Sequence, residues 1–327
     1  MILLLDSKDL TIKARNGCFE IIKDEKAKLI GTSKIEGIIV SAKMSIDTSA
    51  MVLAFQHDIP IYYLDRFGGV VGISRKANFN NASVIRRNQV LFIDHPNATK
   101  WVKTIFDLKQ SGQLLNIKYF IEQKPSLKAK FDGHTEKYTV AIEKIKKLPN
   151  CNLADVRPSL LGFEGSSARL YWEVIAGALP EGYKIESRSK HPATDVFNAS
   201  LNYLYGMLYT QVETAIFSTG MDPTLGIFHT DQYQKPTLAF DIIEPFRPWV
   251  DRFLVMFFLQ NKLETAFFKI SETEVSLDKK GKAVLIPLFL TFMEQATTFK
   301  NQICPRKTHI SRLAGELALE LFNFTKK

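Results

Sequence analysis

Two glutamates and one histidine in this chain are residue types that could together hold a metal ion. Glu164 lies in the segment LLGFEG, His229 in LGIFHT and Glu244 in LAFDIIEPFRP. They are too far apart in the sequence to share one helix, so the fold has to bring them together. Carboxylate oxygens suit Mg²⁺ or Mn²⁺, and an imidazole nitrogen shifts the preference toward Mn²⁺. Because such ions neutralise phosphate groups and activate an attacking hydroxyl, the set predicts phosphodiester chemistry.

Each of these residues also has a purely structural interpretation. Glu164 falls near the first turn of a predicted helix, where a carboxylate interacts favourably with the helix dipole. His229 follows Gly226 in a predicted loop and could be an ordinary hydrogen-bonded histidine. Asp241 and Glu244 are spaced as in a capping box, just before an apolar run. From the residues alone, the structural interpretation of each residue is favoured.

Several common catalytic motifs are absent from the sequence. It contains no G-x-x-x-x-G-K-[ST] loop for nucleotide phosphates, no G-x-G-x-x-G after a strand, no G-x-S-x-G elbow and no H-E-x-x-H pair. The sequence therefore argues against NTPases, common dehydrogenases and α/β-hydrolases.

The charge of the chain favours a polyanionic partner. Its 327 residues carry a formal net charge of +9, and clustered Lys and Arg bind phosphates through counterion release. Nucleic acid is the first candidate and an anionic membrane the second, while a lysine-rich solvated surface is the structural alternative. Arg247 is the favoured phosphate contact, although it could instead pair with Glu244 across a helix turn. The candidate phosphate contacts are Arg75, Arg86, Arg87, Arg188, Lys190, Lys235 and Arg247.

Cysteine content and hydropathy indicate a reduced, cytoplasmic chain. Cys18, Cys151 and Cys304 are widely spaced and odd in number, so neither a disulfide framework nor a cysteine metal site is expected. The start MILLL meets a charged residue at once and lacks a basic region, which predicts a strand and not a signal peptide. The apolar runs at 253–259 and 283–293 are shorter than the roughly 18 residues that span a bilayer, so no membrane partner is expected.

Residues 1–74 are predicted to be rich in β-strands. Asn16-Gly17 tolerates the positive φ of a type I′ turn and lies between alternating apolar residues, which predicts a hairpin. One helix is predicted to begin at Thr48, which could cap it. The polar, basic segment 75–88 is predicted to be a linker between two domains.

From residue 89 to residue 327 the apolar pattern is helical. The first helical stretch is predicted to break at Ser111-Gly112, and Pro245 and Pro248 are expected to disturb a later one. The fold class is therefore predicted as α+β, with a small N-terminal β-rich domain followed by a larger all-helical catalytic domain. The later helices are predicted at 135–148, 162–178, 192–218, 237–260, 285–301 and 309–324.

Four segments in order resemble one known family. They are GFEGSSARLYW, HPATDVFNASLNYLYGMLY, MDPTLGIFHT and LAFDIIEPFRPWVD, and they run from Leu160 to Asp251. Together they are similar to the CRISPR-associated adaptation integrases, the family of the first Cas protein. The β-rich start and the helical remainder also resemble that family, so the resemblance covers the whole chain.

The resemblance implies a metal-dependent DNA endonuclease and integrase. Such a protein joins the 3′-hydroxyl ends of prespacer DNA to a CRISPR repeat by transesterification. By resemblance, Glu164, His229 and Glu244 are both the catalytic residues and the metal ligands, with Mn²⁺ or Mg²⁺ as the cofactor. Some relatives have aspartate at the third position, so Asp241 is either a residue that supports the ligands or an alternative ligand.

The implied partners are DNA and protein. They are double-stranded DNA (prespacer and CRISPR repeat), a second copy of the chain in a homodimer, and a dimer of the second Cas adaptation protein that bridges two homodimers. The resemblance assigns dimer and partner contacts to residues 1–74 and catalysis to residues 89–327.

Two other classes of function stay open. A general metal-dependent branched-DNA nuclease would use the same ligands with water as the nucleophile, and a 3′-hydroxyl on the donor would then not be required. A noncatalytic DNA-binding scaffold would keep the basic surface, and its function would survive the substitution Glu164→Ala.

Overall fold

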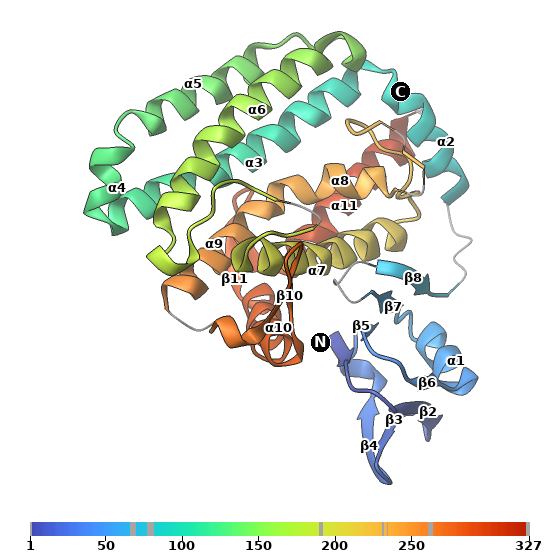
Figure 1. Cartoon of the computed structure of the whole chain (residues 1–327). Coiled ribbons are helices and arrows are strands. Elements are labelled where there is room, and N and C mark those ends of the chain that lie inside the picture. The colour runs from blue at the N-terminus through green and yellow to red at the C-terminus, as the bar shows by residue number, and fades with distance from the viewer. Residues whose placement is uncertain are drawn as a thin grey trace. The chain divides into compact units, whose positions relative to one another are not determined.

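The chain forms two compact units, Met1–Phe79 and Asn80–Lys327, in the computed structural model. The structure describes residues 2–65, 70–76, 82–189, 192–230, 232–233, 235–260 and 264–324. The first unit is rich in strands and the second is mostly helical, which confirms the predicted α+β class (Figure 1). Within the predicted linker 75–88, the chain is helical from Ala82 onward, where α2 (Ala82–Ile93) begins.

The described strands of the first unit form two four-stranded sheets. Their bounds are β1 (Ile2–Leu5), β2 (Thr11–Arg15), β3 (Cys18–Lys23), β4 (Lys26–Gly31), β5 (Gly37–Val40), β6 (Ser45–Ile46), β7 (Ile61–Leu64) and β8 (Val70–Ser74). One sheet has the order β1-β5-β7-β8, and only its β7–β8 pair is antiparallel. The other has the order β4-β3-β2-β6, in which β2, β3 and β4 form two successive antiparallel hairpins and β6 adds to β2 by a short parallel pair.

Two local predictions in the first unit can be compared with the structure. The hairpin at Asn16-Gly17 is confirmed, because β2 and β3 pair across it and the two residues have φ values of 51° and 71°. The predicted helix is α1 (Thr48–Gln56), but its cap is Asp47 and not Thr48. The Asp47 carboxylate accepts a hydrogen bond from the Ser49 N–H at 2.8 Å, and a charged acceptor is the stronger cap.

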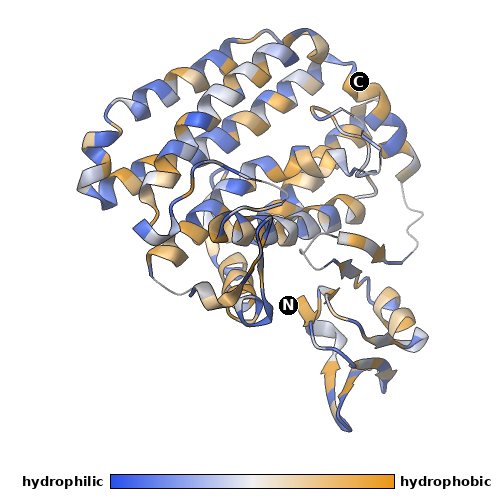
Figure 2. Cartoon of the chain, in the orientation of Figure 1, coloured by the Kyte–Doolittle hydropathy of each residue, from blue (hydrophilic) through white to orange (hydrophobic). Residues whose placement is uncertain are grey.

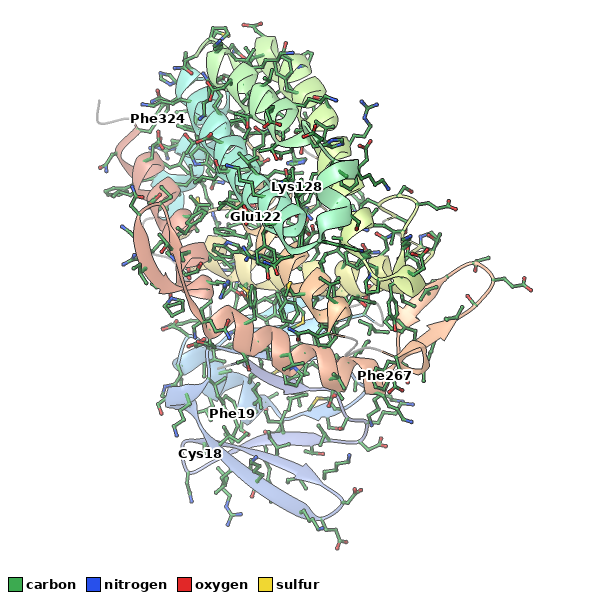
Figure 3. All side chains as sticks on the ribbon, turned by 90° about the vertical axis from the view of Figure 1, so that its left-hand side faces the viewer. Cys18, Phe19, Glu122, Lys128, Phe267 and Phe324 are labelled. Atoms are coloured by element: carbon green, nitrogen blue, oxygen red, sulfur yellow. The ribbon has the colours of Figure 1, made fainter. Side chains whose placement is uncertain are left out.

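The core of the first unit gathers side chains from both sheets and from α1. Ile12, Ile38 and Ala54 are members of it, one from each of these elements. Phe19 belongs to the same core and is fully buried, whereas Cys18 beside it is only partly buried (Figure 3). Apolar packing therefore holds the two sheets and α1 together.

The second unit is organised around one long helix. Its helices and 3-10 turns are α2, α3 (Pro96–Gln123), α4 (Pro125–Lys130), α5 (His134–Lys147), α6 (Leu153–Ala178), η2 (Glu181–Tyr183), α7 (Val196–Ser218), α8 (Thr237–Ile243), η3 (Glu244–Phe246), α9 (Arg247–Leu259), η4 (Thr265–Phe267), α10 (Lys279–Glu294) and α11 (Arg306–Asn323). The helix α3, teal in Figure 1, packs against α6 on one side and against α8, η3 and α9 on the other.

Hydrophilic and hydrophobic residues alternate along these long helices, as expected for helices that bury one face (Figure 2). In the described part of the chain, the structure contains no helix with the length and apolar character that a membrane crossing requires.

The break predicted at Ser111-Gly112 is wrong, because α3 continues through both residues. Gly112 serves close packing instead: a Cβ atom there would lie 3.1 Å from both Cβ and Cγ of Pro248 in the first turn of α9. A glycine inside a helix costs about 1 kcal/mol relative to alanine, and close helix contact offsets that cost here. The unbroken α3 can therefore hold one row of side chains against both α6 and α9.

The disturbance predicted at Pro245 and Pro248 is confirmed. The helix predicted at 237–260 is divided into α8, the 3-10 turn η3 and α9, with one proline in η3 and the other near the start of α9. Proline lacks the N–H that a continuous helix needs but is tolerated in a first turn. Glu244 therefore lies at a corner between two helices.

The prediction of an all-helical second domain is wrong in two places, where short antiparallel hairpins occur. The helix predicted at 285–301 ends early, because Thr297 and Thr298 are β-branched and the tight turn after them has positive φ values at Lys300 (49°) and Asn301 (60°). The strands are β9 (Phe268–Ile270), β10 (Val275–Leu277), β11 (Ala296–Phe299) and β12 (Gln302–Pro305).

Candidate metal centre

Glu164 lies in the interior of α6, about three turns after the helix begins at Leu153. The predicted start at residue 162 was too late, because Asn152 caps the helix and the fully buried Leu160 extends its apolar face. The helix-dipole interpretation of Glu164 is therefore wrong. The glutamate instead lies on the part of α6 that faces α3.

Asp241 and Glu244 are both buried, on α8 and at the start of η3. The capping-box interpretation is wrong, because the Asp241 carboxylate accepts hydrogen bonds from a different segment. Its donors are the backbone N–H groups of Ile227 (2.6 Å), Phe228 (3.0 Å) and His229 (3.0 Å). Asp241 therefore fixes the loop that carries the predicted histidine ligand.

The His229 ring is oriented by the same carboxylate. Nδ1 lies 2.6 Å from Asp241 Oδ1, and a carboxylate that already accepts three N–H bonds is an acceptor, so Nδ1 carries the proton and donates. In the neutral ring, a proton on Nδ1 leaves Nε2 with the lone pair, which is the form of histidine that binds metal ions. A carboxylate on the other ring nitrogen is the usual support of a metal-binding histidine.

Two further residues hold the His229 loop in place. A Cβ atom at Gly226 would lie 2.3 Å from the His229 carbonyl oxygen, so the turn requires glycine. The Arg157 guanidinium, from α6, donates to the Phe228 carbonyl and to the Ile227 carbonyl (3.4 Å), and it lies 5.5 Å from the Phe228 ring. Sequence reasoning did not identify Arg157.

A lysine that the sequence analysis missed joins two of the predicted ligands. Lys109 on α3 places Nζ 2.6 Å from Glu164 Oε1 and 2.5 Å from Glu244 Oε2. Its side chain is 10% exposed, so these ion pairs are largely shielded from solvent. The fold therefore brings Glu164 and Glu244 together on one positive charge.

The electrostatics of this cluster keep Glu244 ionised. Burial alone would raise the pKa of Glu244, but Arg247 and then Lys109 outweigh burial and lower it to about 2. Burial alone would lower the pKa of Lys109, but Glu244 and Glu164 outweigh it and raise that pKa above its ordinary value. Glu244 is therefore held as an anion at neutral pH, as a metal ligand must be.

Arg247 is engaged inside the cluster. Its Nε donates to Glu244 Oε1 at 2.8 Å, which confirms the alternative that it pairs with that glutamate. Its Nη2 donates to the Tyr209 hydroxyl at 2.6 Å, and the guanidinium lies 4.5 Å from the Tyr205 ring centroid. Because it is fixed on three sides, Arg247 is a rigid anchor for Glu244.

A buried network of hydrogen bonds connects the helices around the cluster. The Asp251 carboxylate accepts hydrogen bonds from the hydroxyls of Tyr171 (2.8 Å) and Tyr205 (2.5 Å), and Asn116 Nδ2 donates to that Tyr171 hydroxyl at 3.0 Å. Burial raises the pKa of Asp251 to about 6, although the two tyrosine hydroxyls act in the opposite direction. The network ties α3, α6, α7 and α9 to one another, which fixes the helices that carry the cluster.

The residue types of the cluster fit a divalent metal ion. Two carboxylate oxygens already converge on one cation, and the His229 imidazole is close enough to Glu244 to help lower the pKa of that glutamate. Glu244 Oε2 is held by its ion pair with Lys109 Nζ, at 2.5 Å. Among the described side chains, no three His, Cys, Asp or Glu residues are arranged to hold a metal ion, and the Lys109 ammonium takes the central position.

The predicted phosphate contacts differ in solvent exposure and in the hydrogen bonds that they already form. Arg86, Arg87 and Lys235 are exposed on the second unit, although Arg86 Nε also donates to the Gly220 carbonyl at 3.2 Å. Arg188 is partly buried and is held by the side chains of two asparagines on α7.

Two other candidate phosphate contacts do not lie in the described part of the second unit. Arg75 lies in the first unit and is partly exposed. Lys190 lies outside the residues that the structure describes.

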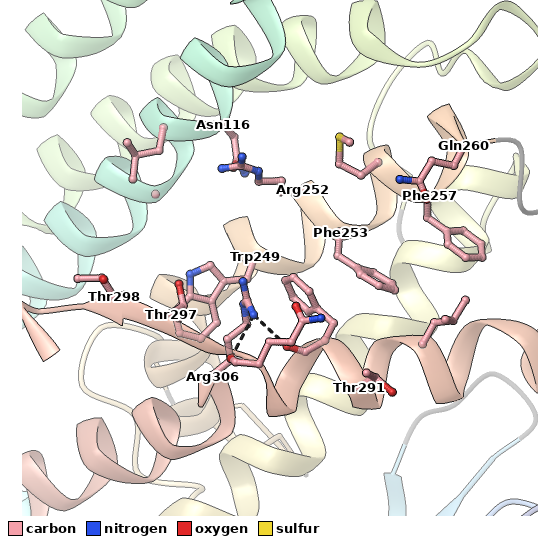
Figure 4. A pocket seen from close by; sticks show the side chains of 16 residues that line it. Asn116, Trp249, Arg252, Phe253, Phe257, Gln260, Thr291, Thr297, Thr298 and Arg306 are labelled. Carbon is pink, nitrogen blue, oxygen red and sulfur yellow. Dashed lines mark hydrogen bonds between the residues drawn. The ribbon is translucent and has the colours of Figure 1, made fainter. Parts of the chain in front are cut away.

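A cavity of about 590 Å³ lies further along α3 and α9, with α10 and β11 completing its wall (Figure 4). Trp249 and Phe253 line it, together with two arginines. Arg252 lies 3.7 Å from the Tyr119 ring centroid, and Arg306 donates to two backbone carbonyls, so both guanidinium groups are engaged. None of the three predicted ligands lines this cavity, which is therefore distinct from the carboxylate cluster.

Comparison with known proteins agrees with this architecture. Residues 3–290 match the family model described as CRISPR associated protein Cas1. The chain is 26% identical over 300 residues to the CRISPR-associated endonuclease Cas1 1 of Thermodesulfovibrio yellowstonii, over 90% of this chain and 92% of that protein.

Two solved structures share the fold. One is a casposase bound to integration product (TM-score 0.84, 21% identity, 100% of this chain and 92% of that one). The other is a chain of a Cas6-RT-Cas1–Cas2 complex (TM-score 0.81, 20% identity, 99% of this chain and 35% of that one). The family match extends over nearly the whole sequence, and the chain belongs to the CRISPR-associated Cas1 family.

Proposed function

We propose that this protein is a metal-dependent DNA endonuclease and integrase of CRISPR adaptation, which joins prespacer 3′-hydroxyl ends to the repeat. The observation that carries the proposal is the convergence of Glu164 and Glu244 on one cation, at 2.6 Å and 2.5 Å. Two carboxylates from separate helices have no structural need to meet, since their repulsion is costly in a buried site. A shared metal ion would explain why the two carboxylates converge.

Each residue of the proposed site has a distinct role. Glu164, His229 and Glu244 would hold Mn²⁺ or Mg²⁺, Asp241 would orient His229, and Arg247 would keep Glu244 in place. When bound, the ion would make the attacking hydroxyl more acidic and stabilise the leaving oxygen. The supporting hydrogen bonds matter because small displacements of reacting groups cost large factors in rate.

The proposed reaction is a single transesterification. The prespacer 3′-oxygen forms a new bond to phosphorus at the repeat boundary, and the bond from that phosphorus to the repeat's own 3′-oxygen breaks. The proton of the attacking hydroxyl leaves and the displaced oxygen takes one up, so the number of phosphodiester bonds is unchanged and no energy source is needed. No protein nucleophile takes part.

DNA binding is assigned to the exposed basic residues of the second unit. Arg86, Arg87 and Lys235 are free to reach phosphates, and such contacts position DNA without reading its sequence. Arg75, Arg188 and Lys190 stay predictions as further contacts. Arg247 is better placed to hold Glu244 than to bind a phosphate directly.

Similar structures support the proposed partners. A similar chain is part of a Cas6-RT-Cas1–Cas2 complex, and a casposase of the same fold was solved with an integration product. These similarities support Cas2 and double-stranded DNA as partners of this chain. A homodimer, bridged to a second one by a Cas2 dimer, is the proposed assembly.

Strand transfer into a repeat-containing plasmid tests this function. A duplex with free 3′-hydroxyls is supplied with Mn²⁺ or Mg²⁺ to the wild type and to Glu164→Ala, His229→Ala and Glu244→Ala. We expect joining by the wild type and a loss of at least about 100-fold in each variant, as for removal of a group that acts on the transition state. Unchanged joining by all three variants would refute the proposed site.

A donor with 3′-deoxy ends separates integration from general nuclease activity. The proposed transesterification requires the 3′-hydroxyl, so the 3′-deoxy donor should give no joined product. Cleavage of branched DNA that proceeds equally well with either donor would favour a nuclease that uses water. Full biological function of Glu164→Ala would favour a noncatalytic scaffold.

A further inference from the structure

Lys109 holds a position that a shared metal ion would also need. Its ammonium contacts one oxygen of each carboxylate, Glu164 Oε1 and Glu244 Oε2. Mg²⁺ binds carboxylate oxygens at about 2.0 to 2.1 Å, so an ion bound to these same two oxygens would overlap the ammonium. The two cations therefore exclude each other.

The ammonium has a structural task as long as no metal ion is bound. Glu164 and Glu244 come from different helices, and two carboxylates that meet without a cation repel each other. Arg247 neutralises Glu244 from the Oε1 side only. Lys109 is thus the group that allows Glu164 to approach Glu244.

Lys109 is also the more displaceable of the two cations. Among the described residues, its ammonium forms ion pairs with Glu164 and Glu244, the two groups that the metal ion would bind, and lies 5.9 Å from the Phe106 ring centroid. Arg247, in contrast, is fixed by Glu244, by the Tyr209 hydroxyl and by the face of Tyr205. A lysine carries its charge on a flexible four-carbon stem, so its ammonium can swing away while the backbone of α3 stays in place.

We propose that Lys109 is a built-in counterion that holds the metal-free carboxylates together and competes with the metal ion for them. This inference rests on the metal site of the proposed function and adds a residue that sets its affinity. Because a metal ion has to displace the ammonium, the lysine lowers the affinity of the site. It also keeps the two ligands gathered before the ion arrives, so Lys109 is a positioning residue.

Metal affinity measured without any reaction tests this role. Mn²⁺ binding to the full chain is followed by calorimetry at pH 8 for the wild type and for Lys109→Met, which keeps the length of the side chain and removes its charge. The matched control is Lys118→Met, at an exposed position of the same helix. We expect Lys109→Met to bind Mn²⁺ at least tenfold more tightly and the control to match the wild type. Equal or weaker binding by Lys109→Met would overturn the proposal.

Thermal unfolding gives a second readout. Without metal, Lys109→Met should unfold at a lower temperature than the wild type, because its carboxylates repel each other. Added Mn²⁺ should stabilise the variant more than it stabilises the wild type. A metal-free variant as stable as the wild type would contradict the counterion role.

Two glutamine variants separate this inference from the proposed function. If Glu164→Gln and Glu244→Gln lose Mn²⁺ binding while Lys109→Met binds like the wild type, the metal site stands and the role of Lys109 is wrong. If both glutamine variants bind Mn²⁺ like the wild type, the metal lies elsewhere and both proposals fail.

A crystal structure of the wild type with Mn²⁺ keeps the proposal testable even if Lys109→Met does not fold. The expected result is Mn²⁺ between Glu164 and Glu244, with Lys109 Nζ no longer in contact with both carboxylates. Mn²⁺ bound to both glutamates with the ammonium still in its original place would overturn the proposal.

Discussion

At the scale of single residues, the proposed site depends on side chains that hold the proposed ligands as much as on those ligands themselves. Asp241 is the clearest case, because one carboxylate fixes three backbone N–H groups and the ring of His229. Lys109 and Arg247 do the same for Glu244 from two sides. Substitution of Asp241 or Arg247 should therefore impair the site without removing a proposed ligand.

The substitution Asp241→Asn tests this idea. It replaces a charged acceptor with an amide, so the loop loses hydrogen bonds and His229 loses the partner that fixes its tautomer. We expect strand transfer to fall roughly 10- to 100-fold, as is typical when the support of a metal ligand is removed. The control is Asp222→Asn, since Asp222 accepts hydrogen bonds from Thr224 at the start of the same loop. Wild-type activity of Asp241→Asn would contradict the role assigned to Asp241.

A second prediction concerns Glu213 on α7, outside the site. Burial raises its pKa to about 7, and its Oε2 has no hydrogen-bond partner among the described residues. The folded state therefore binds the proton more tightly than the unfolded state. The stability contributed by this proton is complete below pH ~4.5 and is lost as the pH rises through ~7.

The substitution Glu213→Gln removes this titration. At pH 8 the variant should be more stable than the wild type by about 2–3 kcal/mol, and at pH 4 the difference should nearly vanish. Chemical denaturation at both pH values measures it, with the exposed Glu122→Gln as the control. An equal difference at both pH values would show that Glu213 does not titrate in this range.

Sequence reasoning at this scale predicted the proposed ligands, with Asp241 as a possible support, but it missed Lys109 and Arg157. Glu164 and Glu244 were predicted, and the structure brings them together on the Lys109 ammonium. Among the described residues, His229 forms no ion pair with either glutamate, although its charge helps to lower the pKa of Glu244. Lys109 lies one helical turn after the buried Ile105, and a lysine on a buried helix face is a signal of an internal ion pair. Its partners could not be predicted, because α3, α6 and η3 meet only in the tertiary structure.

At the scale of elements, the continuous helix α3 is what assembles the site. It presents Lys109 to α6 and η3, and one turn later Gly112 packs against Pro248 of α9. The spacing of α3 and α9 therefore depends on the absence of a side chain at one position. A methyl group there has to push the two helices apart or distort one of them.

The substitution Gly112→Ala tests the packing of these helices. The added Cβ would lie 3.1 Å from two Pro248 atoms, so we expect a loss of about 1–3 kcal/mol of stability despite the better helix propensity of alanine. The matched control is Gly315→Ala in α11, where an added Cβ meets no atom within 4 Å and should stabilise slightly. A stabilised Gly112→Ala would show that the helices do not need this close contact.

Local sequence signals correctly predicted those elements that depend on the backbone preferences of a few adjacent residues. The Asn16-Gly17 hairpin and the changes at Pro245 and Pro248 are confirmed, because both depend on backbone preferences of the residues themselves. Gly112 was misinterpreted as a break because its reason is a contact with a distant helix. The β11–β12 hairpin was missed because its turn residues, Lys300 and Asn301, carry a weaker signal than glycine.

At the scale of the whole molecule, charge governs the first encounter with DNA. A net charge of +9 and exposed residues such as Arg87 predict that DNA affinity falls steeply with salt, because each phosphate contact releases counterions. Arg87→Ala should weaken binding to all sequences alike and reduce the salt slope by about 1. Fluorescence anisotropy over a salt series measures both effects. Affinity that does not change with salt would show that the positive surface serves solubility only.

The central claim is that Glu164 and Glu244 are metal ligands for DNA joining, and isosteric substitution tests it most directly. Strand transfer of a 3′-hydroxyl duplex is measured over a series of Mn²⁺ concentrations for the wild type, Glu164→Gln, Glu244→Gln and the exposed control Glu122→Gln. The account predicts that the control joins DNA like the wild type, whereas both site variants lose joining at every Mn²⁺ concentration. Joining by Glu164→Gln and Glu244→Gln at the wild-type rate and with the same Mn²⁺ dependence would contradict it.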